Sequence, residues 1–292
     1  MYFIENEFLK IEVCSIGAEL FSIYDKKKNV EYLWQGDPVY WKRRAPVLFP
    51  IVGNLKEDRY IYNGIEYSMN QHGFARDKEF KCIYSDKEKI RFKLLFDKDS
   101  LKKYPFKFEL DIEYILTNKK LDIKYSINNI DNKNMFYSIG GHPAFNCPVF
   151  QNENFGDYYL EFEEDTVFES YAFTKDLSAL KNDKILVNHK DNLISLDYDL
   201  FAEDAIILDQ IKCKKVKLKS LKNNDFGIEL NFDDFSYLGI WTKGLNAPFI
   251  CIEPWNGIKD FEFHNGEIDS KVGIRNLNPG NIESFIYNII VD

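Results

Sequence analysis

The chain has 292 residues, 45% of them hydrophobic and 29% charged, which is the balance of a globular protein with a substantial core. Its formal net charge of −9 disfavours nucleic acid and anionic membrane surfaces as partners. The sequence also lacks a signal peptide, a membrane-length apolar run and any C-x-x-C pair among its five cysteines, so we expect a cytoplasmic protein without a membrane span, disulfide framework or zinc site.

Alternation of apolar and polar residues predicts short β-strands along most of the chain. The clearest pattern is a hairpin at 107–130, where apolar side chains at even positions 108–114 and odd positions 121–127 share one face. The letters TNKK between the two runs indicate the turn, and the intervening charged residues indicate one solvent-exposed face. Similar runs predict strands within residues 8–17, 59–69, 87–96, 191–200, 215–221, 226–232 and 285–292.

Helical patterns are scarce and short. Residues 98–106 and 171–182 are each expected to form a helical turn or two. No segment repeats at a fixed period, and no linker rich in proline, serine or glycine divides the chain. We therefore expect a single all-β domain over residues 1–292, an antiparallel sandwich or barrel with a few short helices.

Two of the four histidines lie in glycine-containing segments where the alternation breaks. His72 stands in NQHGFARDKEF and His142 in SIGGHPAFNCP. Glycine lets the backbone approach a ligand closely, and loops on a β-scaffold often carry binding groups. These two histidines are therefore candidate site residues, and the alternative for each is a surface or hydrogen-bonded turn residue.

Three further segments place charged residues at the ends of apolar runs. Glu253 follows such a run in FICIEPWNGIKDF, where burial beside an aromatic ring would make it a base near neutral pH; the alternative is a surface glutamate. Arg43 and Arg44 in WKRRAPVLFPIVGNL and Asp204 in FAEDAIILD would be satisfied by a structural ion pair or by a ligand. Because nucleotide-binding and metal-binding motifs are absent from the sequence, an enzyme is expected to use acid–base chemistry without a cofactor.

Four motifs follow one another in the order APVLFPIVGNL, YNGIEYSMNQHGFARD, GGHPAFNCP and CIEPWNGIKDF. Together they resemble the aldose 1-epimerase (galactose mutarotase) superfamily, and in particular its LacX-like branch, over nearly the whole chain. The resemblance implies the large antiparallel β-sandwich of that superfamily, the galactose mutarotase-like supersandwich, in agreement with the alternation. It also implies interconversion of the α and β anomers of a hexose, with no metal or other cofactor.

The resemblance gives each candidate residue a role. His142 matches the general acid that protonates the ring oxygen, and Glu253 matches the base that removes the proton of the anomeric hydroxyl. His72 matches a histidine that hydrogen-bonds the sugar near the ring oxygen and the anomeric centre. Arg44 and Asp204 resemble contacts to the ring hydroxyls.

Two positions leave the substrate open. Arg76 follows His72 by four residues and is expected to hold that loop or to contact the substrate. Asn54 stands where many relatives carry a basic residue. A hexose-6-phosphate mutarotase, which would bind phosphate through arginines such as Arg43, Arg44 and Arg76, is therefore the alternative to a mutarotase of free hexoses.

Two other classes of protein are considered. A non-catalytic sugar-binding sandwich would keep aromatic residues such as Trp255 without a working acid–base pair. A glycoside hydrolase needs two carboxylates about 5–9.5 Å apart, for which Glu253 and the more weakly supported Asp204 are available. In each case the partner is a small-molecule sugar, and the chain is expected to act as a monomer or a homodimer.

Overall fold

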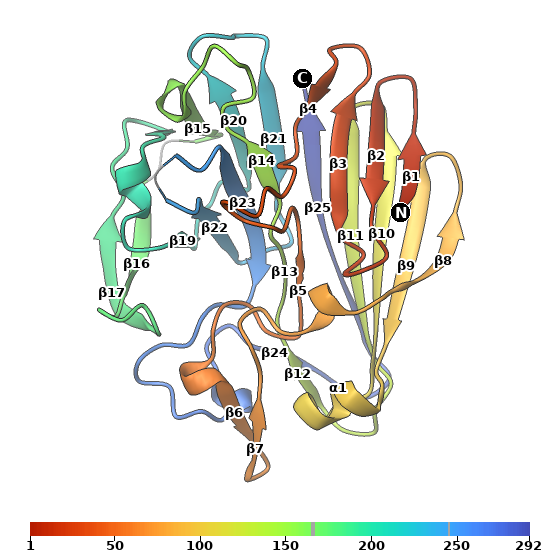
Figure 1. Ribbon diagram of the computed structural model, residues 1–292. Helices are drawn as coiled ribbons and strands as arrows, with labels where there is room; N and C mark the ends of the chain where they lie inside the picture. Colours follow the sequence, from red (N-terminus) through yellow and green to blue (C-terminus); the bar gives the residue numbers. More distant parts are fainter. Residues whose placement is uncertain (165–166, 245) are drawn as a thin grey trace.

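The strands form two large antiparallel sheets in the computed structural model, which describes residues 1–164, 167–244 and 246–292 (Figure 1). The nine-stranded sheet has the order β18 (Leu193–Ser195), β15 (Tyr158–Phe162), β20 (Lys215–Ser220), β21 (Gly227–Asn231), β25 (Ile282–Val291), β11 (Lys120–Asn129), β10 (Phe108–Thr117), β9 (Lys89–Leu95) and β8 (Lys81–Ser85). The eight-stranded sheet has the order β17 (Leu180–Leu186), β16 (Glu169–Phe173), β19 (Ile206–Asp209), β22 (Tyr237–Trp241), β23 (Phe249–Asn256), β13 (Ile139–Gly141) and β5 (Val47–Leu48), and β14 (Ala144–Asn146) also pairs with β23.

Smaller elements complete the fold. A four-stranded sheet runs β1 (Tyr2–Glu5), β2 (Leu9–Val13), β3 (Leu20–Asp25) and β4 (Val30–Glu31), and two pairs are β6 (Arg59–Tyr62) with β7 (Ile65–Ser68) and β12 (Met135–Tyr137) with β24 (Arg275–Leu277). The helices of the described residues are α1 (Lys98–Lys103) and the 3₁₀ turns η1 (Lys56–Asp58), η2 (Ala75–Asp77), η3 (Phe155–Asp157), η4 (Tyr198–Phe201) and η5 (Ile268–Ser270). None of these helices is long and apolar enough to cross a membrane.

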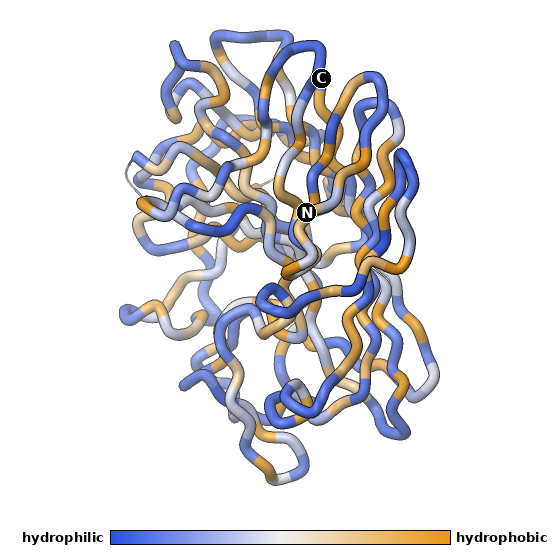
Figure 2. Tube along the Cα trace, turned by 45° about the vertical axis from the view of Figure 1, so that its right-hand side comes forward, coloured by the Kyte–Doolittle hydropathy of each residue, from blue (hydrophilic) through white to orange (hydrophobic). Residues whose placement is uncertain are grey.

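The predicted hairpin at 107–130 is confirmed. Strands β10 and β11 pair from Phe108 opposite Asn129 to Thr117 opposite Lys120, so the turn lies at the predicted letters. Apolar side chains at alternate positions are buried on one face, and Figure 2 shows hydrophobic and hydrophilic residues alternating along many strands. The period of two therefore fixes which face of the sheet meets the core.

The core lies where the larger sheets meet. One cluster of buried side chains includes residues from the four-, nine- and eight-stranded sheets, such as Ile11, Ile112 and Ile240. The hydroxyl of Tyr114 on β10 donates a 2.7 Å hydrogen bond to the carbonyl of Ala18, next to β3. The prediction of an all-β antiparallel sandwich with a few short helices is confirmed, and each of the alternating runs named above contains a strand.

The two helical predictions have different outcomes. Residues 98–106 contain α1, and Asp97 caps its N-terminus by accepting the backbone N–H of Ser100 at 2.6 Å. The prediction for residues 171–182 is wrong, because this segment ends β16, turns and begins β17. In the turn, an oxygen of Asp176 accepts the backbone N–H of Ser178 at 3.2 Å, a local bond that competes with helical backbone bonding.

Truncation of a core residue tests the buried face of the hairpin. Ile112 is fully buried on β10, so Ile112→Ala removes packed methyl groups and leaves a cavity. We expect a loss of about 2–5 kcal/mol in the free energy of unfolding, measured by urea denaturation. Leu95→Ala, at a position that is 49% exposed at the end of β9, is the control, and an equal loss in both variants would contradict the assignment of faces.

Candidate active site

Strand β23 forms the floor of the candidate site. All eight of its residues are buried, and it lies between β22 on one side and β13 and β14 on the other. Glu253 stands near the middle of this strand, opposite Gly239 of β22, and is 1% exposed. The surrounding sheet thus holds an ionisable carboxyl group in the interior of the protein.

Two glycines make room for the indole of Trp255 beside this carboxyl group. A Cβ atom built at Gly140 would lie 2.7 Å from the Trp255 ring, and one built at Gly239 would lie 2.4 Å from it. Both distances are shorter than a side chain tolerates, so only glycine fits at these positions. The glycines on the two neighbouring strands therefore keep Trp255 at the wall of the cavity.

His142 occupies the short connection between β13 and β14. Its backbone N–H donates to the carbonyl of Pro46 at 3.2 Å, and its ring stacks on Trp41 with 4.8 Å between ring centroids. The Nε2 atom of His142 lies 3.2 Å from the Oε2 atom of Glu253. The two residues that the sequence predicted as acid and base are therefore neighbours at the floor of one cavity.

His72 is fixed in a single tautomer by a two-way contact with Gly53. Its backbone N–H donates to the Gly53 carbonyl at 2.9 Å, and its Nδ1 accepts the Gly53 N–H at 3.1 Å. Because Nδ1 is an acceptor, the proton of the neutral ring is on Nε2. The ring lies 5.6 Å from that of His142 and nearly perpendicular to it, so His72 presents a fixed donor to the cavity.

The cavity has a volume of about 230 Å³. Five of the predicted site residues line it, namely His72, Arg76, His142, Asp204 and Glu253. Residues that we did not predict as site residues also line it, and they include Trp41, Gln71, Phe173, Trp241, Lys243 and Lys259. Lys259 belongs to the same motif as Glu253, which is the one sequence signal that could have identified it.

Arg44 is the predicted site residue that the structure does not bring to the cavity. Its guanidinium donates to the carbonyl of Phe21 at 2.7 Å and to the side-chain oxygen of Gln35 at 2.9 Å. The same group lies 4.3 Å from the Phe21 ring, a cation–π contact. Structural partners therefore satisfy Arg44, and its neighbour Arg43 forms an ion pair with Asp77 at 2.8 Å.

Arg76 lines the cavity, and one nitrogen of its guanidinium lacks a hydrogen-bond partner among the described residues. One terminal nitrogen donates to the carbonyl of Gln71 at 2.6 Å, whereas the buried Nε has no hydrogen-bond partner among the described residues. Burial lowers the pKa of Arg76 to about 10, and Arg43 contributes to this shift. Because Arg76 lines the cavity, its guanidinium is placed to donate to a ligand with acceptor oxygens.

Asp204 and Lys259 both line the cavity, and 3.9 Å separates the carboxylate oxygen of Asp204 from the ammonium nitrogen of Lys259. Burial raises the pKa of Asp204, and the charge of Lys259 opposes this rise. Burial likewise lowers the pKa of Lys259, whose ammonium also lies 5.0 Å from the Phe173 ring. Both side chains can therefore exchange their mutual contact for contacts to ligand hydroxyls.

Burial shifts the acid–base pair toward its uncharged form. It raises the pKa of Glu253 well above the usual range of a carboxyl group. It lowers the pKa of His142 to about 3, with a further contribution from the positive charge of Arg76. The two shifts have opposite signs, and each favours the uncharged form of its group, a carboxylic acid beside a neutral imidazole, in the empty cavity.

A buried ion pair between Asp260 and Lys271 connects segments next to the cavity. The ammonium of Lys271 donates to Asp260 and to the carbonyl of Ile258, each at 2.6 Å, and both charged side chains are 1% exposed. Asp260 also accepts the backbone N–H of Lys56 at 2.9 Å, and its own N–H donates to the carbonyl of Asn54 at 3.0 Å. The pair thus joins the Asn54 loop to the segment that carries Lys259.

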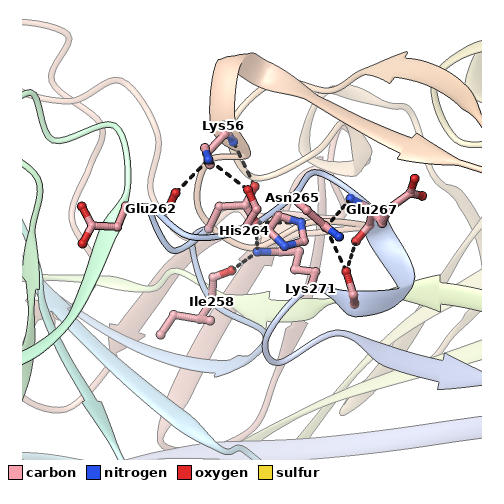
Figure 3. Close-up of polar contacts among 9 residues, drawn as sticks. Lys56, Ile258, Glu262, His264, Asn265, Glu267 and Lys271 are labelled. Carbon is pink, nitrogen blue, oxygen red and sulfur yellow. Dashed lines mark hydrogen bonds and ion pairs between the residues drawn. The ribbon is translucent and has the colours of Figure 1, made fainter.

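A second set of bonds closes the same region (Figure 3). The side chain of Lys56 reaches the backbone carbonyls of Glu262 and His264, at 2.8 and 2.9 Å. Asn265 accepts the backbone N–H of Glu267 at 3.0 Å. These contacts involve main-chain groups, so they fix the course of residues 262–267 beside Lys56.

The antiparallel sandwich, with a buried histidine and glutamate in contact at the floor of its cavity, agrees with the family resemblance drawn from the sequence. The chain belongs to the aldose 1-epimerase family, whose model matches residues 1–272. It is therefore an isomerase that acts on carbohydrates, of the sugar epimerase or mutarotase kind.

The relatives support this membership over the full length. The chain is 35% identical to the plasmid-encoded protein LacX of Lactococcus lactis subsp. lactis, over 99% of this chain and 98% of that protein. It matches a galactose mutarotase related enzyme from Lactobacillus acidophilus with a TM-score of 0.94 and 36% identity, over 100% and 97% of the two chains. A galactose mutarotase-like protein from Lactobacillus casei has the same TM-score at 32% identity, over the whole of both chains.

Removal of one member of the buried ion pair tests its role. Lys271→Met leaves the Asp260 carboxylate buried without its cation, and we expect a loss of about 3–5 kcal/mol in the free energy of unfolding, measured by urea denaturation. Lys102→Met removes an exposed pair with Asp99 on α1 and should leave the midpoint close to that of the wild type. Equal midpoints for the two variants would contradict a supporting role for Lys271.

Proposed function

We propose that the protein interconverts the α and β anomers of a free hexose by general acid–base catalysis. The observation that supports this most directly is the 3.2 Å approach of His142 Nε2 to Glu253 Oε2, both buried at the floor of the cavity. The reaction moves two protons, at the ring oxygen and at the anomeric hydroxyl. Both oxygens are bonded to one carbon, so their proton donor and acceptor must also be close together.

In the ring-opening step, the imidazolium of His142 protonates the ring oxygen while the carboxylate of Glu253 takes the proton of the anomeric hydroxyl. The bond between C1 and the ring oxygen breaks and the aldehyde forms. Rotation about the C1–C2 bond exposes the other face of the aldehyde, and reversal of both transfers closes the ring. A well-placed group contributes about 10²–10⁴-fold to each such proton transfer.

The pair holds one proton throughout this cycle. With a cyclic sugar the proton is on His142, and with the open-chain aldehyde it is on Glu253. The pKa shifts favour the uncharged arrangement in the empty cavity, so a bound cyclic sugar must stabilise the charged one through its hydroxyls. The number of protons on the pair is the same whether the proton lies on His142 or on Glu253. This agrees with a reaction in which the sugar gains and loses no proton overall.

The other groups of the cavity position the sugar. The Nε2–H of His72 donates to oxygens near the anomeric centre, and Arg76 and Asp204 bind ring hydroxyls. The indole of Trp255 supplies an apolar wall for the C–H face of the ring. Arg44 has no part in this proposal, because its partners lie outside the cavity.

Substitution of the acid–base pair tests the reaction. We expect His142→Ala and Glu253→Gln each to reduce the acceleration of α-D-glucose and α-D-galactose mutarotation by about 10²–10⁴-fold, followed by polarimetry. His189→Ala, which alters a histidine outside the cavity lining, is the matched control. Folded wild-type protein that accelerates neither sugar would leave a sugar-binding protein as the better account.

The pH dependence of the wild type follows from the two shifts. Because the pKa of His142 is lowered to about 3, the pair takes up a second proton only near that pH. Because the pKa of Glu253 is raised, the pair loses its single proton at a higher pH than an ordinary carboxyl group would. We expect kcat/KM to be flat through the ordinary histidine pKa of about 6.5 and to fall only on the far acid and alkaline sides.

A hexose 6-phosphate is the second candidate substrate, and the cations of the cavity favour it. Arg76, Lys243 and Lys259 line the cavity together with only two acidic residues, and the Nε atom of Arg76 lacks a partner among the described residues. A phosphate group binds such charge-assisted donors. Of the three arginines considered from the sequence, Arg43 and Arg44 have other partners.

Comparison of glucose with glucose 6-phosphate separates the two substrates. If the phosphate is bound, we expect kcat/KM for glucose 6-phosphate to exceed that for glucose, measured by NMR exchange. The exposed Lys243 should then contribute, so Lys243→Gln lowers kcat/KM for the phosphate and leaves that for glucose near the wild-type value. Equal values for both sugars in both proteins would favour the free hexose.

A further inference from the structure

The thiol of Cys251 lies beside the acid–base pair. Cys251 precedes Glu253 by two residues on β23, so the two side chains point to the same face of the strand. Cys251 is fully buried and pairs with Ala144 of β14, just after His142. One donor atom each from His142, Cys251 and Glu253 lies within 4.8 Å of the other two.

These three donors are the kinds of atom that bind zinc. Structural and catalytic zinc sites use thiolate, imidazole and carboxylate ligands, and catalytic sites keep a fourth position open. Bonds of about 2.0–2.3 Å in a tetrahedral arrangement place ligand atoms about 3.3–3.6 Å apart. The 3.2 Å separation of His142 and Glu253 already matches this spacing, and the most distant pair must close by about 1 Å, which a side-chain rotation supplies.

An independent observation points to a ligand at the same place. The Oε2 atom of Glu253 is buried and, although Nε2 of His142 approaches it to 3.2 Å, it makes no hydrogen bond in the described parts of the chain. Buried carboxylate oxygens are normally paired, and an orphaned one requires an explanation. His142 and Glu253 also line the cavity, which provides an entry path and an open fourth position.

We propose that His142, Cys251 and Glu253 form a binding site for a thiophilic divalent cation of the zinc class, and that its occupation inhibits the enzyme. Binding itself depends only on the three donors. The inhibition rests on the proposed function, because the cation would occupy the imidazole lone pair and the carboxylate that transfer protons in the mutarotase reaction.

The charges and protons of the bound state balance. The Cys251 thiol releases its proton on binding, as does the Glu253 carboxyl group when it is protonated, and neutral His142 donates a lone pair. The thiolate and the carboxylate together neutralise the double positive charge, so the buried site carries no net charge. Magnesium and calcium are hard cations that prefer sites made of oxygen ligands, and we expect them not to bind here.

The fold explains why the spacing of cysteines indicated no zinc site. The ligands come from β23 and from the connection between β13 and β14, about 110 residues apart in the chain, and not from a C-x-x-C pair. Within residues 1–164, 167–244 and 246–292, this trio is the single cluster of at least three such side chains with donors close enough to share an ion. The three donors are therefore close together in the folded protein although His142 is far from the other two in the sequence.

Cobalt(II), a spectroscopic probe for zinc sites, tests binding without any assay of activity. We expect chelator-treated wild type to show a thiolate-to-cobalt charge-transfer band on titration with Co²⁺, and excess Zn²⁺ to abolish it. Cys251→Ser should lose the band, and Cys251→Ala serves if the serine variant fails to fold by circular dichroism. Cys14→Ser, a substitution of a half-buried cysteine outside the trio, should keep the band. Absence of the band in wild type, or its persistence in folded Cys251 variants, would overturn the proposal.

Mutarotation measured with and without Zn²⁺ tests the inhibition. We expect Zn²⁺ to stop the wild-type reaction and a chelator to restore it, whereas Mg²⁺ has no effect. Cys251→Ala should require about tenfold more Zn²⁺ or more for half-inhibition, since even loss of a group that only orients a ligand costs 10–100-fold in affinity. If cobalt binds but zinc does not inhibit, the inhibitory role is refuted and the metal-binding site itself remains supported. A wild type without mutarotase activity would refute the proposed function, and the cobalt titration would still decide the site.

Discussion

The burial of Glu253 beside His142 is the constraint on which the rest of the site depends. A charged group transferred from water to the protein interior loses several kcal/mol of solvation, so neither residue is stable there as an isolated ion. That penalty is avoided when one proton lies on the carboxyl group and both groups of the pair, 3.2 Å apart, are uncharged. Strand β23, buried along its whole length, and the aromatic rings of Trp41 and Trp241 around His142 hold the two groups in place.

The loops around this pair are connected to one another by hydrogen bonds between their main chains. Gly53 is the meeting point: its backbone binds His72 in both directions, and a Cβ atom there would lie 2.8 Å from the Lys259 backbone. The ion pair of Asp260 with Lys271 fixes the same two segments from the interior. A site that needs precision of a few tenths of an ångström is thus supported by backbone contacts more than by flexible side chains.

Features that depend on local sequence could be predicted, and features that depend on distant partners could not. The hairpin at 107–130 follows from its alternation, and His142 and Glu253 stand in short motifs whose composition is unusual for strands. The sequence around Arg44 is equally suggestive, but its acceptors come from a separate segment that no pattern connects to it. Lys259 and Cys251 stand in the same motif as Glu253, but their neighbours Asp204 and His142 come from segments far along the chain, and such long-range proximity is not visible in one sequence.

The contact between His72 and Gly53 has a consequence for how the site responds to its surroundings. A second proton on the ring would have to replace the hydrogen bond that Nδ1 accepts from a main-chain N–H, and burial together with nearby positive charge already lowers the pKa of His72. His72 therefore stays neutral, with its proton on Nε2, and does not take up a second proton as an exposed histidine would. In the proposed reaction, the electric field that His72 imposes on a bound ring oxygen would stay constant while the proton moves between His142 and Glu253, so the group that orients the substrate would be separate from the groups that react with it.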